Sequence, residues 1–327
     1  MTKLMTEREA IERFVSDGDT VYVGYTSVAY GLTHEIIRQR KRHLECVGGS
    51  VGPQATLLFM AGCANRVRSG YIAGALRPGA VTAMMDDGRL HFEDYSNQAI
   101  ALMLMAGALG IPFIPTRSFL GTDYLRPDYQ EHPGAIADYR KWAEMESPFD
   151  GQKVVLLPAL KPDVAILHAH RADEDGNVQL WGHAGDAQWA YWAARKPIVS
   201  VEEIVPRETI LNDPGRTVVP GFKVAAVVHM PWGAHPSPFV GHYEADYGFH
   251  AKMMSRIGAS HDGYAAFAEQ WIHGVDDRAG YIRKYINEFG QPTLDAVRVD
   301  AGRSPGPGVR YGYGSHLRFR LPEGDAS

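Results

Sequence analysis

The chain is poor in cysteine and has no excess of charge of one sign. Cys46 and Cys63 are the only cysteines in 327 residues. Two cysteines are too few for a disulfide framework, which predicts a reducing, cytoplasmic compartment. Lysine and arginine number 33 against 38 aspartate and glutamate, so the net charge is −5. Because proteins that bind nucleic acid carry a basic surface, this balance predicts no nucleic-acid partner.

Long hydrophobic runs are also lacking. The longest one covers 99–111 and is followed at once by Pro112. It is too short to cross a bilayer, which takes about 20 residues, so we expect a buried helix there. The first 14 residues have no apolar core of the kind found in signal peptides. The sequence therefore predicts a protein without a membrane partner.

Motifs for the common nucleotide cofactors are missing. The chain has no GxxxxGK[ST] segment and no GxGxxG after a predicted strand. This excludes the usual P-loop and dinucleotide-binding interpretations, and no cofactor is expected. The glycine-rich segment 48–52 does follow a predicted strand. It is either an anion site built from backbone N–H groups or a turn that needs glycine.

What the chain does have is the pattern of an α/β protein. Apolar residues make up 45% and charged residues 22% of the sequence, as in folded globular proteins. Strand and helix patterns alternate, which is typical of βαβ units and a parallel sheet. We expect one α/β domain over 1–301, an open, mostly parallel sheet with helices on both faces, and a Gly/Pro/Arg-rich tail over 302–327. The predicted strands cover 20–24, 44–47, 67–72, 81–85, 154–157, 164–167, 198–201 and 224–228, and the predicted helices cover 7–15, 32–40, 97–109, 185–194 and much of 247–289.

Details of two regions follow from composition. The runs at 154–157 and 164–167 are continuously apolar, which predicts strands buried on both faces. The stretch 121–150 is rich in proline, tyrosine and acidic residues and is expected to form a loop excursion.

Ser96 and Gly110 are expected to cap the two ends of the helix over 97–109.

Two histidines, His168 and His170, are spaced to lie on the same side of one predicted strand. Asp173 and Asp175 follow them, so a metal cluster is conceivable. No third ligand has a convincing spacing, however. We therefore predict a hydrogen-bonded histidine pair near a sheet edge and no metal site.

Four further side chains are candidates for chemistry. Glu93 and Asp94 precede a predicted helix, where carboxylates either stabilise the positive helix end or act as a general base. Arg117 follows an extended segment and could hold a substrate carboxylate or phosphate, or form a plain salt bridge. His235 lies in a proline-rich loop beyond a strand end, where open α/β sheets bind ligands. Its alternative is a structural loop histidine.

Five segments together resemble the A subunits of the class I coenzyme A (CoA) transferases, most closely that of glutaconate CoA-transferase. They occur in the family's order and extend over roughly residues 5–285. The segments are SDGDTV at 16–21, FEDYS at 92–96, LGIPFIP at 109–115, VAILHAHRA at 164–172 with DGNV at 175–178 and WG at 181–182, and GAHPS at 233–237.

The resemblance implies a CoA-transferase/NagB-like fold and, as partner, a homologous B subunit. In that family a glutamate from the B subunit is the nucleophile that attacks an acyl-CoA thioester, and CoA is a substrate rather than a cofactor. The Ser-Glu-Asn-Gly type of motif that carries this glutamate is absent here. We therefore expect an A-type chain that is inactive alone and shapes the site for acyl-CoA and a glutaconate-like or 3-oxo acid.

Two departures from the family pattern keep an alternative open. The loop Gly24-Tyr25-Thr26-Ser27, expected to bind substrate, replaces a Gly-Gly-Phe loop. Arg117 resembles a branch of the fold that opens rings of steroid-derived CoA thioesters by hydrolysis, using an acid of the A subunit. If the counterpart of that acid is Asn97, the acid is missing here and Asn97 is a substrate-binding residue. A non-catalytic binding protein on the same scaffold is the third possibility, since fold does not fix function.

Overall fold

A computed structural model describes residues 2–26, 28–72, 79–126 and 140–299, and within them the core is a nine-stranded sheet. Seven of these strands run parallel in the order β12-β10-β8-β1-β2-β3-β4. They are β1 (Thr20–Tyr22), β2 (Leu44–Gly48), β3 (Ala64–Ser69), β4 (His91–Asp94), β8 (Val164–Ala172), β10 (Lys196–Ile204) and β12 (Ala226–His229). Two short strands, β9 (Val178–Gln179) and β11 (Thr217–Val219), continue it antiparallel from β8. The expectation of an open, mostly parallel α/β sheet is confirmed.

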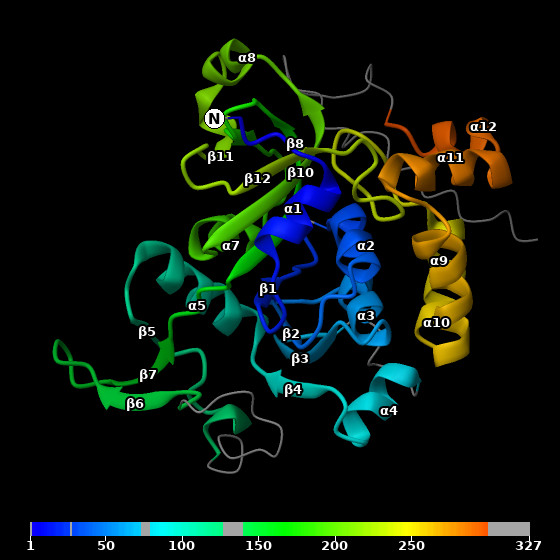
Figure 1. Ribbon diagram of the computed structural model, residues 1–327. Helices are drawn as coiled ribbons and strands as arrows, with labels where there is room; N and C mark the ends of the chain where they lie inside the picture. Colours follow the sequence, from blue (N-terminus) through cyan, green and yellow to red (C-terminus); the bar gives the residue numbers. More distant parts are fainter. Residues whose placement is uncertain (1, 27, 73–78, 127–139, 300–327) are drawn as a thin grey trace, which may run out of the picture.

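Helices cover both faces of the sheet (Figure 1). One layer holds α1 (Glu7–Phe14), α2 (Tyr30–Arg38) and α3 (Pro53–Met60), and the other holds α5 (Asn97–Leu109) and α7 (Ala187–Ala193). Helix α5 begins where expected, because the Ser96 hydroxyl accepts a hydrogen bond from the Ala99 N–H at 3.1 Å. It ends at Gly110, whose φ of 74° is the left-handed conformation that glycine adopts without strain.

The predicted strand over 81–85 is wrong, because this segment forms the helix α4 (Ala80–Asp86). Its apolar residues Ala80, Val81 and Met84 are buried together, at the spacing of one helical face. The Thr82 hydroxyl accepts a hydrogen bond from the Gly79 N–H at 2.8 Å and fixes the helix start. The helix is also the crossover that two parallel neighbours, β3 and β4, require.

A small antiparallel sheet forms a second layer of strands. Its order is β5 (Phe113–Thr116), β7 (Lys153–Pro158), β6 (Ala143–Glu146). The prediction that 154–157 is buried on both faces is wrong, since Val155 and Leu157 are buried while Val154 and Leu156 are only partly covered. The loop expected over 121–150 is also interrupted, by β6 and by the short 3-10 helix at Asp123–Leu125.

Helices dominate the last part of the described chain, as predicted. These are α9 (Tyr247–Ile257), α10 (His261–Ala268), the π turn Glu269–His273, α11 (Arg278–Phe289) and α12 (Gln291–Ala296). They pack outside α2 and α3 around buried Trp271, Tyr281 and Tyr285. The remaining helical pieces are α8 (Arg207–Leu211) and the 3-10 turn Pro214–Arg216.

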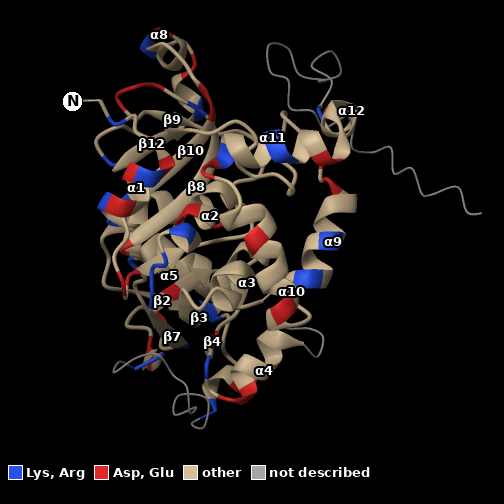
Figure 2. Ribbon diagram, turned by 45° about the vertical axis from the view of Figure 1, so that its right-hand side comes forward, with Lys and Arg blue, Asp and Glu red and all other residues tan. Residues whose placement is uncertain are grey.

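Basic and acidic residues are interspersed over the described helices and strands (Figure 2). No helix within the described ranges is long and apolar enough to cross a membrane. The predicted tail 302–327 lies outside the described residues, so its separation from a domain over 1–301 stays a prediction.

Candidate active site

The direction of the chain across the sheet reverses between β1 and β8. Strands β1 to β4 follow one another to one side of this point, and β8, β10 and β12 lie on the other side. Open α/β sheets bind their ligands outside the carboxyl ends of the strands at such a switch point. The loops at the carboxyl ends of β1, β2, β3 and β4, on one side of this switch point, are therefore the candidate site, called the crevice below.

Backbone hydrogen bonds join the loops that leave these strands. The Tyr25 N–H donates to the Ser50 carbonyl at 3.0 Å, and the Val51 N–H donates to the Tyr71 carbonyl at 2.9 Å. The Gly70 N–H donates to the Gly49 carbonyl at 3.0 Å. The three loops thus form one connected floor under the crevice.

Glycines permit this close approach. A Cβ at Gly52 would lie 2.8 Å from the Tyr25 ring, and one at Gly70 would lie 2.5 Å from the Asn97 nitrogen. The Gly49 N–H donates to Oδ2 of Asp186 at 2.7 Å, so it is already used within the protein. Of the two interpretations of 48–52, the packed turn is favoured over the anion site.

Asn97 is the first residue of α5 and lies at this crevice. It is exposed, and its Nδ2 donates to the Ser50 hydroxyl at 3.0 Å. Tyr25 and Tyr71, whose backbones bond to Ser50 and Val51, are 55% and 39% exposed. The open side of the crevice therefore presents an amide, a hydroxyl and two aromatic rings.

The structure brings together most of the loop residues predicted to bind substrate. Gly24 is buried at the end of β1, and Tyr25 follows it into the open. The Thr26 hydroxyl donates to the Ala184 carbonyl at 2.9 Å, so it faces the segment before α7. Ser27 lies outside the described residues.

Glu93 and Asp94 lie within the protein, at positions that fit a structural role. Glu93 is buried on β4 in register with Arg68, which also forms an ion pair with Glu45 at 2.7 Å. Asp94 accepts a hydrogen bond from the Tyr124 hydroxyl at 3.4 Å. Burial lowers the pKa of the neighbouring Lys141 ammonium, and the charges of the two carboxylates oppose that shift. Their surroundings favour the structural interpretation, and a general-base role stays a prediction.

Arg117 is exposed and follows β5 in the small sheet. Its charge acts on Asp150, whose pKa is lowered mainly by hydrogen bonds from the Ser147 hydroxyl and the Gln152 N–H, and less by Arg117. The Arg117 guanidinium is thus placed beside a surface carboxylate. Its role as a substrate anchor stays a prediction.

His235 is fully buried between the C-terminal helices and the loop after β12. Nδ1 lies 3.0 Å from the Tyr281 hydroxyl, and Nε2 lies 3.3 Å from Oδ2 of Asp246. Burial lowers the pKa of the imidazole to about 4, although the hydrogen bond to Asp246 opposes this. This environment favours the structural alternative, and substrate binding by His235 stays a prediction.

The pair His168 and His170 is hydrogen-bonded, as expected. His168 contacts the Ser200 hydroxyl at 2.9 Å and the Glu202 carboxylate at 2.8 Å, and His170 contacts the Val240 carbonyl at 2.7 Å. The placement near a sheet edge is wrong, because β8 lies between β1 and β10. Within the part of the chain that the structure describes, no three potential ligand side chains gather to hold a metal ion.

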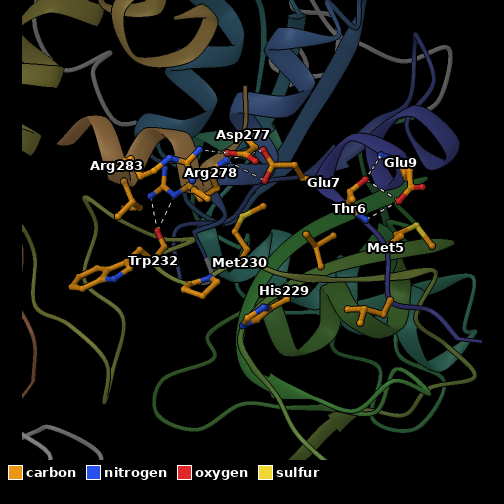
Figure 3. A pocket seen from close by; sticks show the side chains of 15 residues that line it. Met5, Thr6, Glu7, Glu9, His229, Met230, Trp232, Asp277, Arg278 and Arg283 are labelled. Atoms are coloured by element: carbon orange, nitrogen blue, oxygen red, sulfur yellow. Dashed lines mark hydrogen bonds and ion pairs between the residues drawn. The ribbon is translucent and has the colours of Figure 1, made fainter. Parts of the chain in front are cut away.

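A separate pocket of about 660 Å³ lies at the carboxyl end of the edge strand β12 (Figure 3). Its walls come from residues 4–9, the loop 228–232 and the start of α11. Several of its polar groups are engaged with the protein: Nε of Arg278 donates to the Trp232 carbonyl, and Thr6 and Glu9 form the capping box of α1. None of the site residues predicted from the sequence lines it. In the sheet order, β10 and β8 separate its strand from β1.

Two residues that shape the crevice are not apparent from the sequence alone. Asp186 bridges the Tyr22 hydroxyl at 2.9 Å and the Gly49 N–H at 2.7 Å. Gln54, fully buried in α3, donates to the carbonyls of Val23 and Gly24, both at 2.9 Å. These bonds join residues 30 to 164 positions apart, so no local spacing indicates them.

Comparison with known proteins decides the family. The sequence profile of the coenzyme A transferase family matches residues 4–230. The chain belongs to the coenzyme A transferase family. The prediction of an A-type CoA-transferase chain, made from five segments, is confirmed.

Relatives cover nearly the whole chain. The A subunit of the 3-oxoadipate CoA-transferase of Pseudomonas knackmussii is 34% identical over 293 residues, which span 87% of this chain and 98% of the relative. The A subunit of the glutaconate CoA-transferase of Acidaminococcus fermentans is 31% identical over 318 residues, 92% of this chain and 96% of that one. The crystal structure of that glutaconate CoA-transferase superposes with a TM-score of 0.82, covering 95% of this chain and 98% of the other.

A more distant relative represents the hydrolase branch. The cholesterol ring-cleaving hydrolase IpdA subunit of Mycobacterium tuberculosis is 26% identical over 242 residues, 69% of this chain and 77% of its own length. Similarity to the hydrolase branch, which Arg117 suggested, thus extends over 69% of the chain.

Proposed function

We propose that the chain pairs with a homologous B subunit to form a CoA-transferase site between the two, with this chain on the acyl-substrate side. The proposed reaction moves CoA from an acyl-CoA to a dicarboxylic or 3-oxo acid. Glutaconate and 3-oxoadipate, named for two of the relatives, are both dicarboxylates. CoA takes part as a substrate and no other cofactor is proposed. The two buried free thiols, Cys46 and Cys63, fit a reducing cytoplasm.

The observation that carries this proposal is the chemistry of the open crevice. It presents the amide of Asn97 and the hydroxyl of Ser50, which can donate hydrogen bonds to a carboxylate. Neither group can form the acid anhydride that a glutamate nucleophile forms. Of the two carboxylates before α5, Glu93 is buried within the sheet, and Asp94 accepts a hydrogen bond from the Tyr124 hydroxyl. The nucleophile is therefore proposed to come from the B subunit.

In the proposed reaction the partner's glutamate carboxylate attacks the thioester carbonyl carbon. The C–S bond breaks, CoA leaves as thiolate, and an acyl–glutamyl anhydride remains. The thiolate then attacks the glutamyl carbonyl, so the first acid leaves and a glutamyl-CoA thioester forms. A second acid reverses both steps. Asn97 and Ser50 are proposed to donate hydrogen bonds to the acid, holding it for attack.

Hydrolytic ring opening is the second candidate, because the IpdA relative and Arg117 point towards it. That reaction needs a carboxylic acid from this chain in the crevice. The exposed side chain that begins α5 is an amide, which favours transfer over hydrolysis.

The decisive experiment is co-expression of the chain with its B subunit. The purified complex is incubated with glutaconyl-CoA or 3-oxoadipyl-CoA, with and without acetate, and the intact chains are weighed by mass spectrometry. We expect a CoA-sized adduct on the partner chain and CoA transfer that depends on acetate. In a parallel incubation with a cyclic acyl-CoA, water added to the ring skeleton, with CoA still attached and no adduct, would establish the hydrolase instead.

Asn97→Ala in the same complex tests the crevice. Because a hydrogen bond to a charged group contributes about 1.5–3 kcal/mol, we expect kcat/KM to fall by about 10- to 100-fold. The matched control is Gln98→Ala, which removes an exposed amide from the next position of α5. Equal kinetics of the two variants would remove Asn97 from the site.

A further inference from the structure

Asp186 lies beneath the crevice. Although it precedes α7, its carboxylate links the end of β1 to the residue after β2. It is partly buried just before α7. Oδ1 accepts a hydrogen bond from the Tyr22 hydroxyl at 2.9 Å, and Oδ2 accepts one from the Gly49 N–H at 2.7 Å. Tyr22 ends β1 and Gly49 directly follows β2.

Gly49 is the peptide on which the neighbouring loops converge. Its carbonyl accepts hydrogen bonds from the Gly70 N–H at 3.0 Å and the Ser69 hydroxyl at 3.2 Å. A Cβ at Gly49 would lie 3.1 Å from Oδ2 of Asp186 and 3.3 Å from the Asn97 carbonyl oxygen. The carboxylate thus holds the backbone one residue before Ser50 and next to Asn97, the two side chains that face the open crevice.

We propose that Asp186 is a positioning residue of the transferase: by fixing the Gly49 peptide against Tyr22, it sets the Ser50–Asn97 pair for the acid substrate. This inference rests on the proposed function. Asp186 itself stays beneath the floor of the crevice and acts through Gly49 and Ser50.

The arrangement calls for a carboxylate. Two donors, a phenol and a backbone N–H, converge on it, and an ionised carboxylate offers an acceptor oxygen to each. Such charge-assisted bonds are about twice as strong as neutral ones. Tyr22 is fully buried, and burial together with the nearby charge of Asp186 raises the pKa of its hydroxyl, so it remains a donor. An asparagine would turn an NH2 group towards one of the two donors.

The test is Asp186→Asn in the complex with the B subunit, with CoA transfer from an acyl-CoA to the acid as the assay. We expect kcat/KM for the acid to fall by 10-fold or more. The matched control is Asp163→Asn, because Asp163 also accepts a backbone N–H of β1, that of Thr20 at 3.1 Å, but at the amino end of the strand. It removes an equal charge far from the crevice, and we expect it to leave kcat/KM within 2-fold.

A double-mutant cycle separates positioning from a general loss of structure. If Asp186 acts through Ser50, adding Ser50→Ala to Asp186→Asn lowers kcat/KM little further than the larger single effect. Independent, multiplying effects would overturn the proposal, as would equal kinetics of the Asp186 and Asp163 variants. Tyr22→Phe removes one of the two donors and leaves the ring in place, so it repeats the cycle should Asp186→Asn fail to fold. A wild-type complex without CoA transfer would overturn the proposed function itself, before any variant is compared.

Discussion

At the residue scale, Arg117 is the side chain that suggests the hydrolase alternative. It is exposed beside Asp150 on the surface of the small sheet. Exposed ion pairs contribute at most about 1 kcal/mol, so Arg117→Ala should leave the free energy of unfolding nearly unchanged. We also expect kcat/KM for CoA transfer to change by less than about 3-fold, or about 0.6 kcal/mol. A fall of 10-fold or more in a folded variant would instead make Arg117 the anchor of a substrate carboxylate or phosphate.

His235 makes stability depend on pH. Burial lowers the pKa of its imidazole from 6.5 to about 4 in the folded chain. Between these values the unfolded chain binds a proton that the folded chain does not, so stability falls as the pH drops from 6.5 towards 4. At about 1.4 kcal/mol for each pKa unit, the loss is about 3 kcal/mol.

Urea unfolding at pH 7 and pH 4.5 measures this loss. His235→Gln should weaken the dependence on pH, whereas His91→Gln, a change at an exposed position of β4, should leave it as in the wild type. The same slope in both variants would assign the acid sensitivity to other groups.

Among the loops and helices that build the crevice, Gly70 is a position with very little room. A Cβ there would lie 2.5 Å from the Asn97 nitrogen and 2.7 Å from the Tyr95 carbonyl oxygen, both backbone atoms. Because backbone cannot rotate aside, we expect Gly70→Ala to lower the free energy of unfolding by about 1–3 kcal/mol. Gly215→Ala is the control, since nothing lies within 4 Å of its Cβ. Similar thermal midpoints for both variants would contradict the crowding at the carboxyl end of β3.

Local sequence signals predict a helix well where capping residues mark both of its ends. Helix α5 begins and ends at the residues expected from Ser96 and Gly110, since both caps act within a few residues of the chain. The segment 80–86 resembles a strand in sequence because a short apolar run has no clear period. Its helix follows from the need to cross between β3 and β4, which only the tertiary structure supplies. For the same reason the apolar pattern of β7 suggests a parallel sheet, whereas the strand lies in the antiparallel one.

The candidate site, like the fold, is predictable from sequence only where local patterns locate its residues. The loop at Gly24–Thr26 and Asn97 at the start of α5 follow strand ends, which sequence patterns locate. Asp186 and Gln54 cannot be found in this way, because their contacts depend on how distant segments pack. The buried setting of His235 has the same origin, since its partners Asp246 and Tyr281 come from the helical part of the chain.

At the scale of the whole molecule, Arg278 connects the two ends of the described chain. Nε donates to the Trp232 carbonyl at 3.0 Å, and the Arg278 backbone N–H donates to Oε1 of Glu7 at 3.1 Å. Glu7 in turn forms an ion pair with Arg38 on α2. One buried residue thus holds the N-terminal helix, the loop after β12 and α11 together.

Arg278→Met should therefore destabilise the fold. It removes the Arg278 donor from the His235 carbonyl and leaves the Trp232 carbonyl with only the His235 N–H as donor. An unsatisfied buried group costs about 1–3 kcal/mol. Arg283→Met, on the same helix but with its side chain 69% exposed, should change the free energy of unfolding by less than about 0.5 kcal/mol. Equal urea midpoints for the two variants would show that the Arg278 side chain does not stabilise the fold in this way.

The hydrogen bonds of Gln54 have a consequence for which amino-acid substitutions the loop after β1 can accept. Its Nε2 binds the Val23 and Gly24 carbonyls at 2.9 Å, and its Oε1 accepts the Ala29 N–H at 3.1 Å. The two ends of the loop, at Gly24 and Ala29, are thus held by a residue of α3, outside the loop itself. Residues 25–28 can diverge in sequence while the two ends of the loop stay in place. Under the proposed function, a few substitutions in this loop would therefore alter substrate preference without a change of fold, provided that position 54 keeps its amide.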